Sequence, residues 1–535
     1  MKKTLVATLL AASALCSQPL FADNEPPKLT LYTTEWQIYD TIVDGEIVYP
    51  GYSYDGSYTD YGAWHNDNTP ESQPIKNDDM IAQFQYADVI PFSFMQVWNH
   101  DDPNQAKYLD PKNIGSSWDG ILHFSDLYAD LTYFRGDDSK TCTTLGTASC
   151  AAVQLNTRVT PNVLELFQYL EDPTVGGRGA FKAFINSTKY NTNINGLGVK
   201  RILAIGGANT TQNHSVSDYT FRALFDSKKR DQFLASLKRW KNAYPNIKGL
   251  DFDFEPPINA DGSQVPVSDA TIADYKNLLA LVKATRDTMK SIDPYFYISV
   301  TITSNLDYLE KIKTAGSNGG NWYTELYPIV DSLNIMTYDL HGPWSEDGDP
   351  LTAIHSALTQ TSGDEAAEIQ YGGIQSIQTV LDMGFGANKL QMGIPEYGRA
   401  FAGVKHDTKM ANLPGYYASW THMATIDELG NTHTTQKGFL PYKSVKEMTE
   451  KNGYLQQNVI DPISLKTNGG YIYNPGDGTS ENGIFIGYET PEEVVSVCNF
   501  IKNKGLKGVI MWSVDTDLPV SNPASLIASY RDAGC

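Results

Sequence analysis

Short apolar runs recur eight times along the chain, and most of them precede a segment with helical spacing. Strands that alternate with helices are typical of a parallel sheet, and eight such units predict a closed (β/α)8 TIM barrel, an α/β fold. In such barrels the side chains that carry out chemistry lie at the carboxyl ends of the strands. The predicted strands are residues 29–32, 87–94, 201–207, 249–255, 297–302, 332–339, 389–395 and 507–513.

Two helices are predicted most clearly by their apolar spacing. The first carries Phe233, Leu234, Leu237 and Trp240 at helical intervals. The second begins after Ser268, a residue type favoured at helix N-caps. Its predicted apolar face consists of Ile272, Tyr275, Leu278, Leu279 and Val282.

A long segment between the seventh and eighth strands breaks this alternation. Residues 400–484 are rich in glycine, asparagine and threonine, and we expect a small inserted α+β domain that walls one side of the active-site cleft. The barrel then consists of residues 23–399 and 485–535.

The fourth predicted strand carries three carboxylates. A period of two places Asp251, Asp253 and Glu255 on one face and Leu250, Phe252 and Phe254 on the other. Buried charges are rare without a function, and neighbouring carboxylates raise one another's proton affinity, as a general acid requires. Glu255, at the strand's exit, is the best placed to act. A calcium loop would need glycine and polar residues between the carboxylates, whereas a solvated acidic edge strand remains an alternative.

Composition limits the classes of partner. The 535 residues, 41% hydrophobic, suffice for a large core and more than one folding unit. A formal net charge of −21 repels polyanions, so nucleic acids and anionic membranes are poor partners. The 32 tyrosines and 9 tryptophans suit stacking on sugar rings, although ordinary packing explains any single one equally well.

The amino terminus has the pattern of a secretory signal. Met1-Lys2-Lys3 precedes an apolar run from Leu5 to Leu15, and cleavage is expected after Ala22, so that residues 1–22 form a signal peptide. No other run approaches the length needed to span a bilayer. We therefore expect a secreted protein, either periplasmic or extracellular.

Four cysteines follow the signal: Cys142, Cys150, Cys498 and Cys535. Proximity in sequence favours the disulfides Cys142–Cys150 and Cys498–Cys535, and buried free thiols are the alternative. No Cys-x-x-Cys or His-Glu-x-x-His pattern is present, so we predict no metal site.

Several motifs occur in an order that is typical of one family. They are Gly249-x-Asp251-x-Asp253-x-Glu255, Ala204-Ile205-Gly206-Gly207, Met336-Thr337-Tyr338-Asp339, Gly342-Pro343-Trp344 and Tyr397-Gly398-Arg399. On these motifs the chain resembles glycoside hydrolase family 18, in the bacterial chitinase branch that has an insertion domain.

The resemblance implies retaining hydrolysis of chitin and chito-oligosaccharides, with the substrate's own acetamido oxygen as nucleophile. Glu255 would protonate the leaving oxygen and then activate water. Asp253, backed by Asp251, would orient the acetamido group, and Tyr338 would hold its carbonyl. No metal and no cofactor would take part. The residues expected to bind the sugars are Asp339, Trp512, Trp344, Tyr397, Arg399, Tyr32 and Met336.

Two positions depart from the family's pattern. Ala204 stands where a serine usually helps to satisfy the inner aspartate, so one hydrogen bond to Asp251 is expected to be lost. Lys248 replaces the motif's first aspartate, either as a compensating charge or as a solvent-facing side chain.

Three other functions stay open. A non-catalytic chitin-binding lectin is one, and an endo-β-N-acetylglucosaminidase acting on glycoproteins is another. The long segments at 40–80 and 98–195 also suggest a chitinase that works as a subunit of a larger secreted assembly.

Overall fold

The computed structural model describes residues 26–34, 82–100, 119–124, 185, 191–207, 221, 223–256, 265–344, 351–359, 372–405, 412–430, 437–449, 454–460, 467–477, 482–514 and 516–535. Three predictions lie outside these residues: the signal peptide at 1–22, the Cys142–Cys150 pair and the long segment at 40–80. Among the described residues, no helix has the length and apolar character that crossing a membrane demands.

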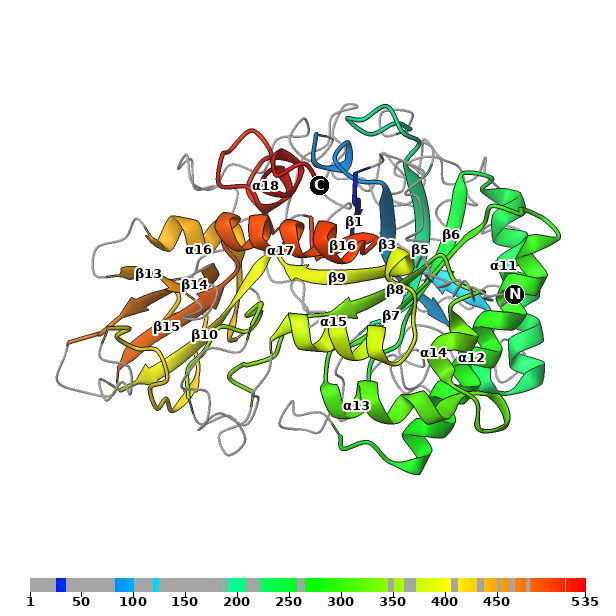
Figure 1. Cartoon of the computed structure of the whole chain (residues 1–535), viewed down its shortest axis with the longest axis horizontal. Coiled ribbons are helices and arrows are strands. Elements are labelled where there is room, and N and C mark those ends of the chain that lie inside the picture. The colour runs from blue at the N-terminus through cyan, green and yellow to red at the C-terminus, as the bar shows by residue number, and fades with distance from the viewer. Residues whose placement is uncertain are drawn as a thin grey trace, which may run out of the picture.

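A closed parallel barrel forms one half of the molecule (Figure 1). Each strand pairs with the next along the chain, and β1 pairs with both β3 and β16, which closes the barrel. The eight predicted strands are thereby confirmed. They are β1 (Lys28–Leu31), β3 (Val89–Val97), β5 (Lys200–Gly206), β6 (Ile247–Asp253), β7 (Tyr297–Thr303), β8 (Ser332–Met336), β9 (Leu390–Pro395) and β16 (Gly508–Trp512). Two short strands, β2 (Thr33–Thr34) and β4 (Leu122–Phe124), pair with β3.

Helices cover the outside of this barrel (Figure 1). The two that were predicted are α11 (Ser227–Ala243) and α12 (Asp269–Lys290). Ser268 is the N-cap of α12, as predicted, and its side chain accepts a hydrogen bond from the Thr271 amide. The other elements on the barrel are α13 (Leu306–Lys311), α14 (Trp322–Leu326), α15 (Gly373–Asp382), α17 (Pro491–Lys504), α18 (Leu526–Asp532) and the 3₁₀ turns η4 (Ile312–Ala315), η5 (Ser317–Gly319) and η7 (Ala387–Lys389).

The predicted apolar faces pack into the core. On α11, Phe233 and Leu237 are fully buried, and on α12 Tyr275, Leu278 and Val282 are fully buried. Ile272, predicted on the same face of α12, is only half-buried.

A second, antiparallel sheet lies between β9 and β16 in sequence, at the left in Figure 1. This sheet and its helix are the α+β insertion that the sequence predicted. Aromatic rings fill one of its faces, with Phe401, Tyr471 and Phe485 fully buried. Its elements are β10 (Tyr397–Val404), β11 (His422–Met423), β12 (Phe439–Pro441), α16 (Tyr442–Thr449), β13 (Leu455–Ile460), β14 (Thr467–Asn474) and β15 (Gly483–Tyr488).

Two buried glutamates join this second sheet to the barrel. Glu489 directly follows β15 and Glu493 lies in the first turn of α17, and they are 2% and 0% exposed. Glu493 Oε1 accepts a hydrogen bond from the Leu358 amide at 3.0 Å. Burial raises the pKa of Glu489 to about 8. Burial, and then the Glu489 charge, raise the pKa of Glu493 well above its usual value. Both carboxyls therefore hold their protons at neutral pH.

The carboxyl terminus is fastened to the amino end of the barrel. Cys498 on α17 and Cys535 form a disulfide, which confirms that predicted pair. The Arg531 guanidinium donates to Asp88 Oδ2 at 2.8 Å and to the Tyr86 carbonyl. These contacts hold α18 beside the starts of β1 and β3.

Candidate active site

The predicted alternation along β6 is confirmed. Asp251 and Asp253 are 0% and 4% exposed and point into the barrel, whereas Leu250 and Phe252 pack on the outside against the core. Glu255 follows two residues after the end of β6 and is half-buried. The alternative of an acidic edge strand is wrong, because β6 pairs with β5 on one side and with β7 on the other.

Asp251 is held by hydroxyl groups. Tyr32 Oη donates to its Oδ2 at 2.8 Å, Ser299 Oγ donates to its Oδ1 at 2.5 Å, and Thr301 Oγ1 lies 3.1 and 3.2 Å from the two oxygens. Burial raises the pKa of Asp251 to about 6, against the lowering effect of these hydrogen bonds. Asn334 Nδ2 donates to Thr301 Oγ1 at 2.9 Å and so continues the network.

The two departures from the family pattern have clear structural outcomes. Ala204 is fully buried against Tyr32 and supplies no hydroxyl, but Ser299 and Thr301 on β7 donate to Asp251 in its place. Lys248 is exposed and donates to the Pro245 carbonyl at 3.1 Å. It therefore faces solvent, the second of the two interpretations, and does not compensate Asp251.

Asp253 lies between the other two carboxylates. Burial raises its pKa well above the usual value, and the charges of Glu255 and then Asp251 add to the shift. The close approach of β5 requires glycine, since a Cβ at Gly206 would lie 2.0 Å from the Asp253 carbonyl oxygen and φ there is +109°. The Gly206-Gly207 pair therefore sets the end of β5 directly against the carboxylate row.

A second cluster is organised around Asp339, which follows β8 and has a left-handed backbone with φ of +58°. Arg399 binds it in a bidentate manner, through Nε at 2.7 Å and Nη2 at 2.6 Å, and Tyr397 Oη donates to it at 2.9 Å. Burial opposes its ionisation, but the Arg399 charge holds the pKa of Asp339 well below its usual range. Asp339 is therefore a fixed anion.

His355 completes this cluster and was not predicted. Its ring is fully buried and stacks on Tyr397 with centroids 5.0 Å apart. Burial lowers its pKa. His355 Nδ1 lies 3.3 Å from Asp339 Oδ1 and 3.4 Å from the Asp339 amide, and Nε2 lies 3.1 Å from the Tyr397 carbonyl, so the ring is held between Asp339 and the Tyr397 backbone. A lone histidine between strands carries no sequence signal that could have revealed this role.

Tyr338 connects the two clusters. Burial raises its pKa well above the usual value, and Tyr397, Asp253 and Glu255 contribute in that order. Its hydroxyl thus stays protonated and is available as a donor near the carboxylates. Its ring meets that of Tyr397 edge-on, with centroids 6.1 Å apart.

Aromatic rings from several strands line the same end of the barrel. Trp512, half-buried at the end of β16, stacks on Phe94 at 5.5 Å and lies 5.7 Å from Tyr32. Met336 packs against this group. Trp344 lies instead beside the second cluster, where the Arg399 guanidinium is 5.1 Å from its ring. Phe94 was not among the predicted site residues, because nothing separates it from a core phenylalanine in the sequence.

The predicted site residues within the described chain therefore come together at one end of the barrel. They comprise the carboxylate row on β6, the Asp339 cluster and the aromatic group around Trp512. Within the residues that the structure describes, no group of three His, Cys, Asp or Glu side chains is arranged to hold a metal ion.

Fold and site define a class of protein: a (β/α)8 barrel with a row of carboxylates at the carboxyl end of its fourth strand and an antiparallel insertion before its eighth. The chain belongs to glycosyl hydrolases family 18, whose model matches residues 58–517.

The similar proteins are named as chitinases or as a chitinase-like binder. "Probable chitinase 10" of Drosophila melanogaster is 28% identical over 331 residues, which cover 62% of this chain and 13% of that relative. Chitinase ChiA74 from Bacillus thuringiensis superposes with a TM-score of 0.62 at 18% identity, over 95% of this chain and 70% of that one. Human YKL-39 is described as a pseudo-chitinase with retained chitooligosaccharide binding. It superposes with a TM-score of 0.56 at 15% identity, over 95% of this chain and 99% of that one. The chain thus spans a small part of the first relative, and the two structures support the fold.

Proposed function

We propose that this protein is a chitinase, which hydrolyses β-1,4 linkages between N-acetylglucosamine units with retention of configuration. The observation that carries the proposal is the intact row on β6, in which Glu255 follows the strand and Asp253 lies buried beneath it. A family 18 lectin without activity typically lacks the acid at this position.

In the proposed first step Glu255 donates its proton to the glycosidic oxygen while the bond from that oxygen to the anomeric carbon breaks. The acetamido oxygen of the same sugar forms a bond to the anomeric carbon, which gives a cyclic oxazolinium ion. In the second step Glu255 removes a proton from water, the water oxygen attacks the anomeric carbon, and the acetamido group is released.

The neighbouring groups would position this nucleophile. Asp253 accepts the acetamido N–H and, with Asp251 behind it, stabilises the positive charge that develops there. Tyr338, which keeps its proton, donates to the acetamido oxygen. Trp512 offers a flat apolar surface to the reacting sugar, and Trp344 offers one to the leaving side.

The test compares the mature protein with Glu255→Gln on a chromogenic chitotrioside, with chito-oligosaccharide affinity measured for both. We expect a loss of roughly 10²–10⁴-fold in kcat with affinity retained, the range that general acid–base catalysis contributes. The matched control is Glu310→Gln, an exposed residue on α13, which should behave as the parent protein.

The same experiment distinguishes the chitinase from the two other functions. Binding without cleavage by both proteins would favour the lectin, for which Ala204 in place of serine is the supporting observation. Release of glycans from a high-mannose glycoprotein, without cleavage of the chitotrioside, would favour the endo-β-N-acetylglucosaminidase.

We also propose export through the amino-terminal signal. Expression of the full sequence in a bacterial host should yield an exported product that begins at Asp23. Amino-terminal sequencing of the periplasmic and extracellular fractions checks this, and an intracellular product that retains Met1 would contradict it.

A further inference from the structure

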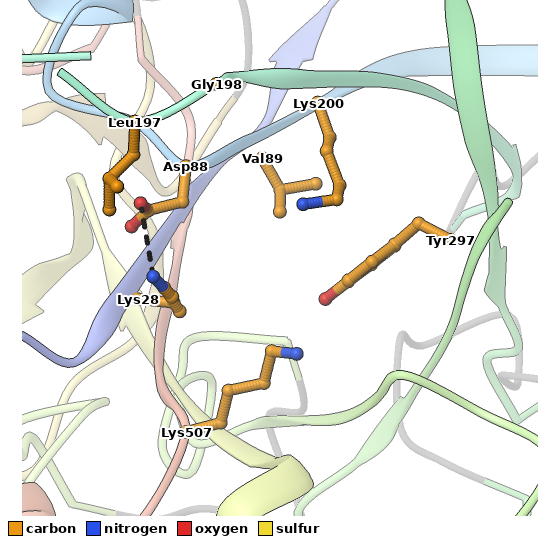
Figure 2. Close-up of a pocket in the computed structure, with 8 residues that line it drawn as sticks. All are labelled: Lys28, Asp88, Val89, Leu197, Gly198, Lys200, Tyr297 and Lys507. Atoms are coloured by element: carbon orange, nitrogen blue, oxygen red, sulfur yellow. Dashed lines mark ion pairs between the residues drawn. The ribbon is translucent and has the colours of Figure 1, made fainter. Parts of the chain in front are cut away.

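A pocket lies at the opposite end of the barrel from the carboxylates. Its volume is about 230 Å³, and residues at the starts of several barrel strands line it (Figure 2). Lys28, Val89, Lys200 and Tyr297 are the first residues of β1, β3, β5 and β7, and Lys507 directly precedes β16. The pocket is therefore built into the amino end of the barrel.

Positive charge is in excess there. Asp88 is the acidic residue among the lining side chains, and its carboxylate is already bound by Arg531 at 2.8 Å, by the Leu29 amide and by Asn193. Lys28 Nζ lies a further 3.9 Å from it. The local cations thus outnumber the carboxylate in a chain whose formal charge is −21, where chance placement would favour the reverse.

Two of the lysines have no carboxylate partner within the described part of the chain. Lys507 Nζ donates to the Asp331 carbonyl at 2.8 Å and lies 5.0 Å from the ring of Tyr297. Lys200 is an exposed residue whose ammonium group is directed into the pocket in Figure 2. Like charges that converge repel one another, and a bound anion would reduce that repulsion.

The buried Tyr297 hydroxyl is a second feature, independent of the lysines, that points to a ligand in this pocket. Tyr297 is 6% exposed, and its Oη is buried with no hydrogen-bond partner. The nearby Ser332 hydroxyl interacts with the Tyr297 hydroxyl and lowers its pKa, while its own proton is directed to Asn334 at 2.6 Å or to Gln391 at 2.7 Å. In Figure 2 the Tyr297 hydroxyl points into the space between the ammonium groups of Lys200 and Lys507. A buried hydroxyl that makes no hydrogen bond of normal geometry is rare in a folded protein and marks a place for a ligand atom.

We propose that this pocket binds a tetrahedral oxyanion, either inorganic phosphate or the phosphate group of a small phosphomonoester. Lys200 and Lys507 supply charge-assisted hydrogen bonds, and the Tyr297 hydroxyl donates a third from another direction. Donors that converge from three strands fit an anion with oxygens on several sides.

The titration of Lys507 provides a further readout. Burial lowers its pKa to about 8, Asp331 opposes this shift, and Lys200, Lys389 and Lys28 add to it. Asp331 is itself bound by Arg286 at 2.5 Å. A bound anion favours the charged ammonium group, so affinity should be highest below pH 8 and fall as the pH rises above it.

The test is isothermal titration of the mature protein with inorganic phosphate, at constant ionic strength and in a buffer without phosphate, together with thermal unfolding. We expect saturable binding with a rise in Tm, and at least a tenfold loss of affinity in Tyr297→Phe and in Lys200→Gln. The matched control is Lys283→Gln, an exposed lysine on α12, which should bind as the parent does. The pH dependence is measured with sulfate, because its charge does not change between pH 6 and 9. A fall in sulfate affinity above pH 8 then reports the loss of charge on the protein.

Tyr297→Phe removes only an unpaired hydroxyl, so its Tm without phosphate should equal or exceed that of the parent, which separates lost binding from lost folding. Glucose 6-phosphate distinguishes the two sources of the oxyanion: tighter binding than phosphate indicates a phosphomonoester, and equal binding indicates the free ion. The proposal is overturned if the parent shows no saturable binding of phosphate. It is also overturned if Tyr297→Phe and Lys200→Gln bind phosphate with the affinity of the parent.

Discussion

Asp251 depends on side chains that are far from it in the sequence. Its donors Ser299 and Thr301 are 48 and 50 residues away, and Tyr32 is 219 residues away. Parallel pairing of β6 with β7 sets Asp251 opposite Ser299, and the pairing with β5 sets it opposite Ala204. The hydroxyl that the family usually takes from one neighbouring strand is therefore supplied by the other.

The first prediction concerns the pH dependence of hydrolysis. The hydrogen bond from Ser299 lowers the pKa of Asp251, so Ser299→Ala should raise that pKa above its present value of about 6. If Asp251 acts as an anion, the acid limb of kcat/KM moves up by roughly one pH unit, the size of a lost bond to a charged group. Ala204→Ser adds a donor on the other side and should move the limb down. Identical pH profiles for the three proteins would contradict this role.

The second prediction concerns the Asp339 cluster. Arg399→Lys replaces a bidentate contact with a point charge and removes the planar group that faces Trp344. We expect KM for chito-oligosaccharides to rise by roughly tenfold or more, as the loss of one charge-assisted bond implies, with a smaller change in kcat. Tyr397→Phe removes a single hydrogen bond and should have a smaller effect. Steady-state kinetics that match the parent in both variants would show that the cluster does not position the substrate.

At the scale of the element, α17 begins in an unusual way. Acidic residues near a helix amino terminus are ordinarily exposed, as Glu492 is, but Glu493 is buried against Glu489 at the end of β15. Two carboxyls buried against each other are stable only while they keep their protons.

The third prediction concerns stability against pH. The folded-state pKa of Glu489 is about 8 and its ordinary value is 4.5, so the folded protein keeps a proton that the unfolded chain has lost. Stability should therefore fall as pH rises from about 4.5 to 8, with a slope near 1.4 kcal/mol per pH unit for one linked proton. Glu489→Gln should flatten this dependence in urea unfolding between pH 5 and 8.5. Glu492→Gln is the matched control, and a slope that is the same in both variants would refute the proton assigned to buried Glu489.

Element boundaries and capping could be predicted where the signal is local. Ser268 as the N-cap of α12 and the alternation along β6 depend only on near neighbours, and both predictions were correct. Contacts across the barrel could not be predicted. Ser299 and Thr301 are residue types found in any strand, and His355 and Phe94 carry no distinguishing pattern around them. Their roles depend on register, which a single sequence does not state.

At the scale of the whole molecule, the large negative charge makes a prediction about the substrate. Chito-oligosaccharides are neutral, so the field of the protein cannot steer them. Raising the salt concentration from 20 to 300 mM should change kcat/KM by less than about twofold, because screening has no charge on the substrate to act on. A steep decline or rise with salt would point to a charged substrate and against chitin.

The placement of the second sheet bears on how such a protein can diversify. The chain leaves the barrel after β9 and returns through α17 to β16, and these two strands are hydrogen-bonded neighbours. Without the sheet, β9, α17 and β16 would still form an ordinary right-handed crossover. The sheet nevertheless carries Tyr397 and Arg399 in its first strand, and both bind Asp339. A different sheet inserted between β9 and α17 would therefore change the residues that hold Asp339, while β6 and its carboxylates keep their place in the barrel.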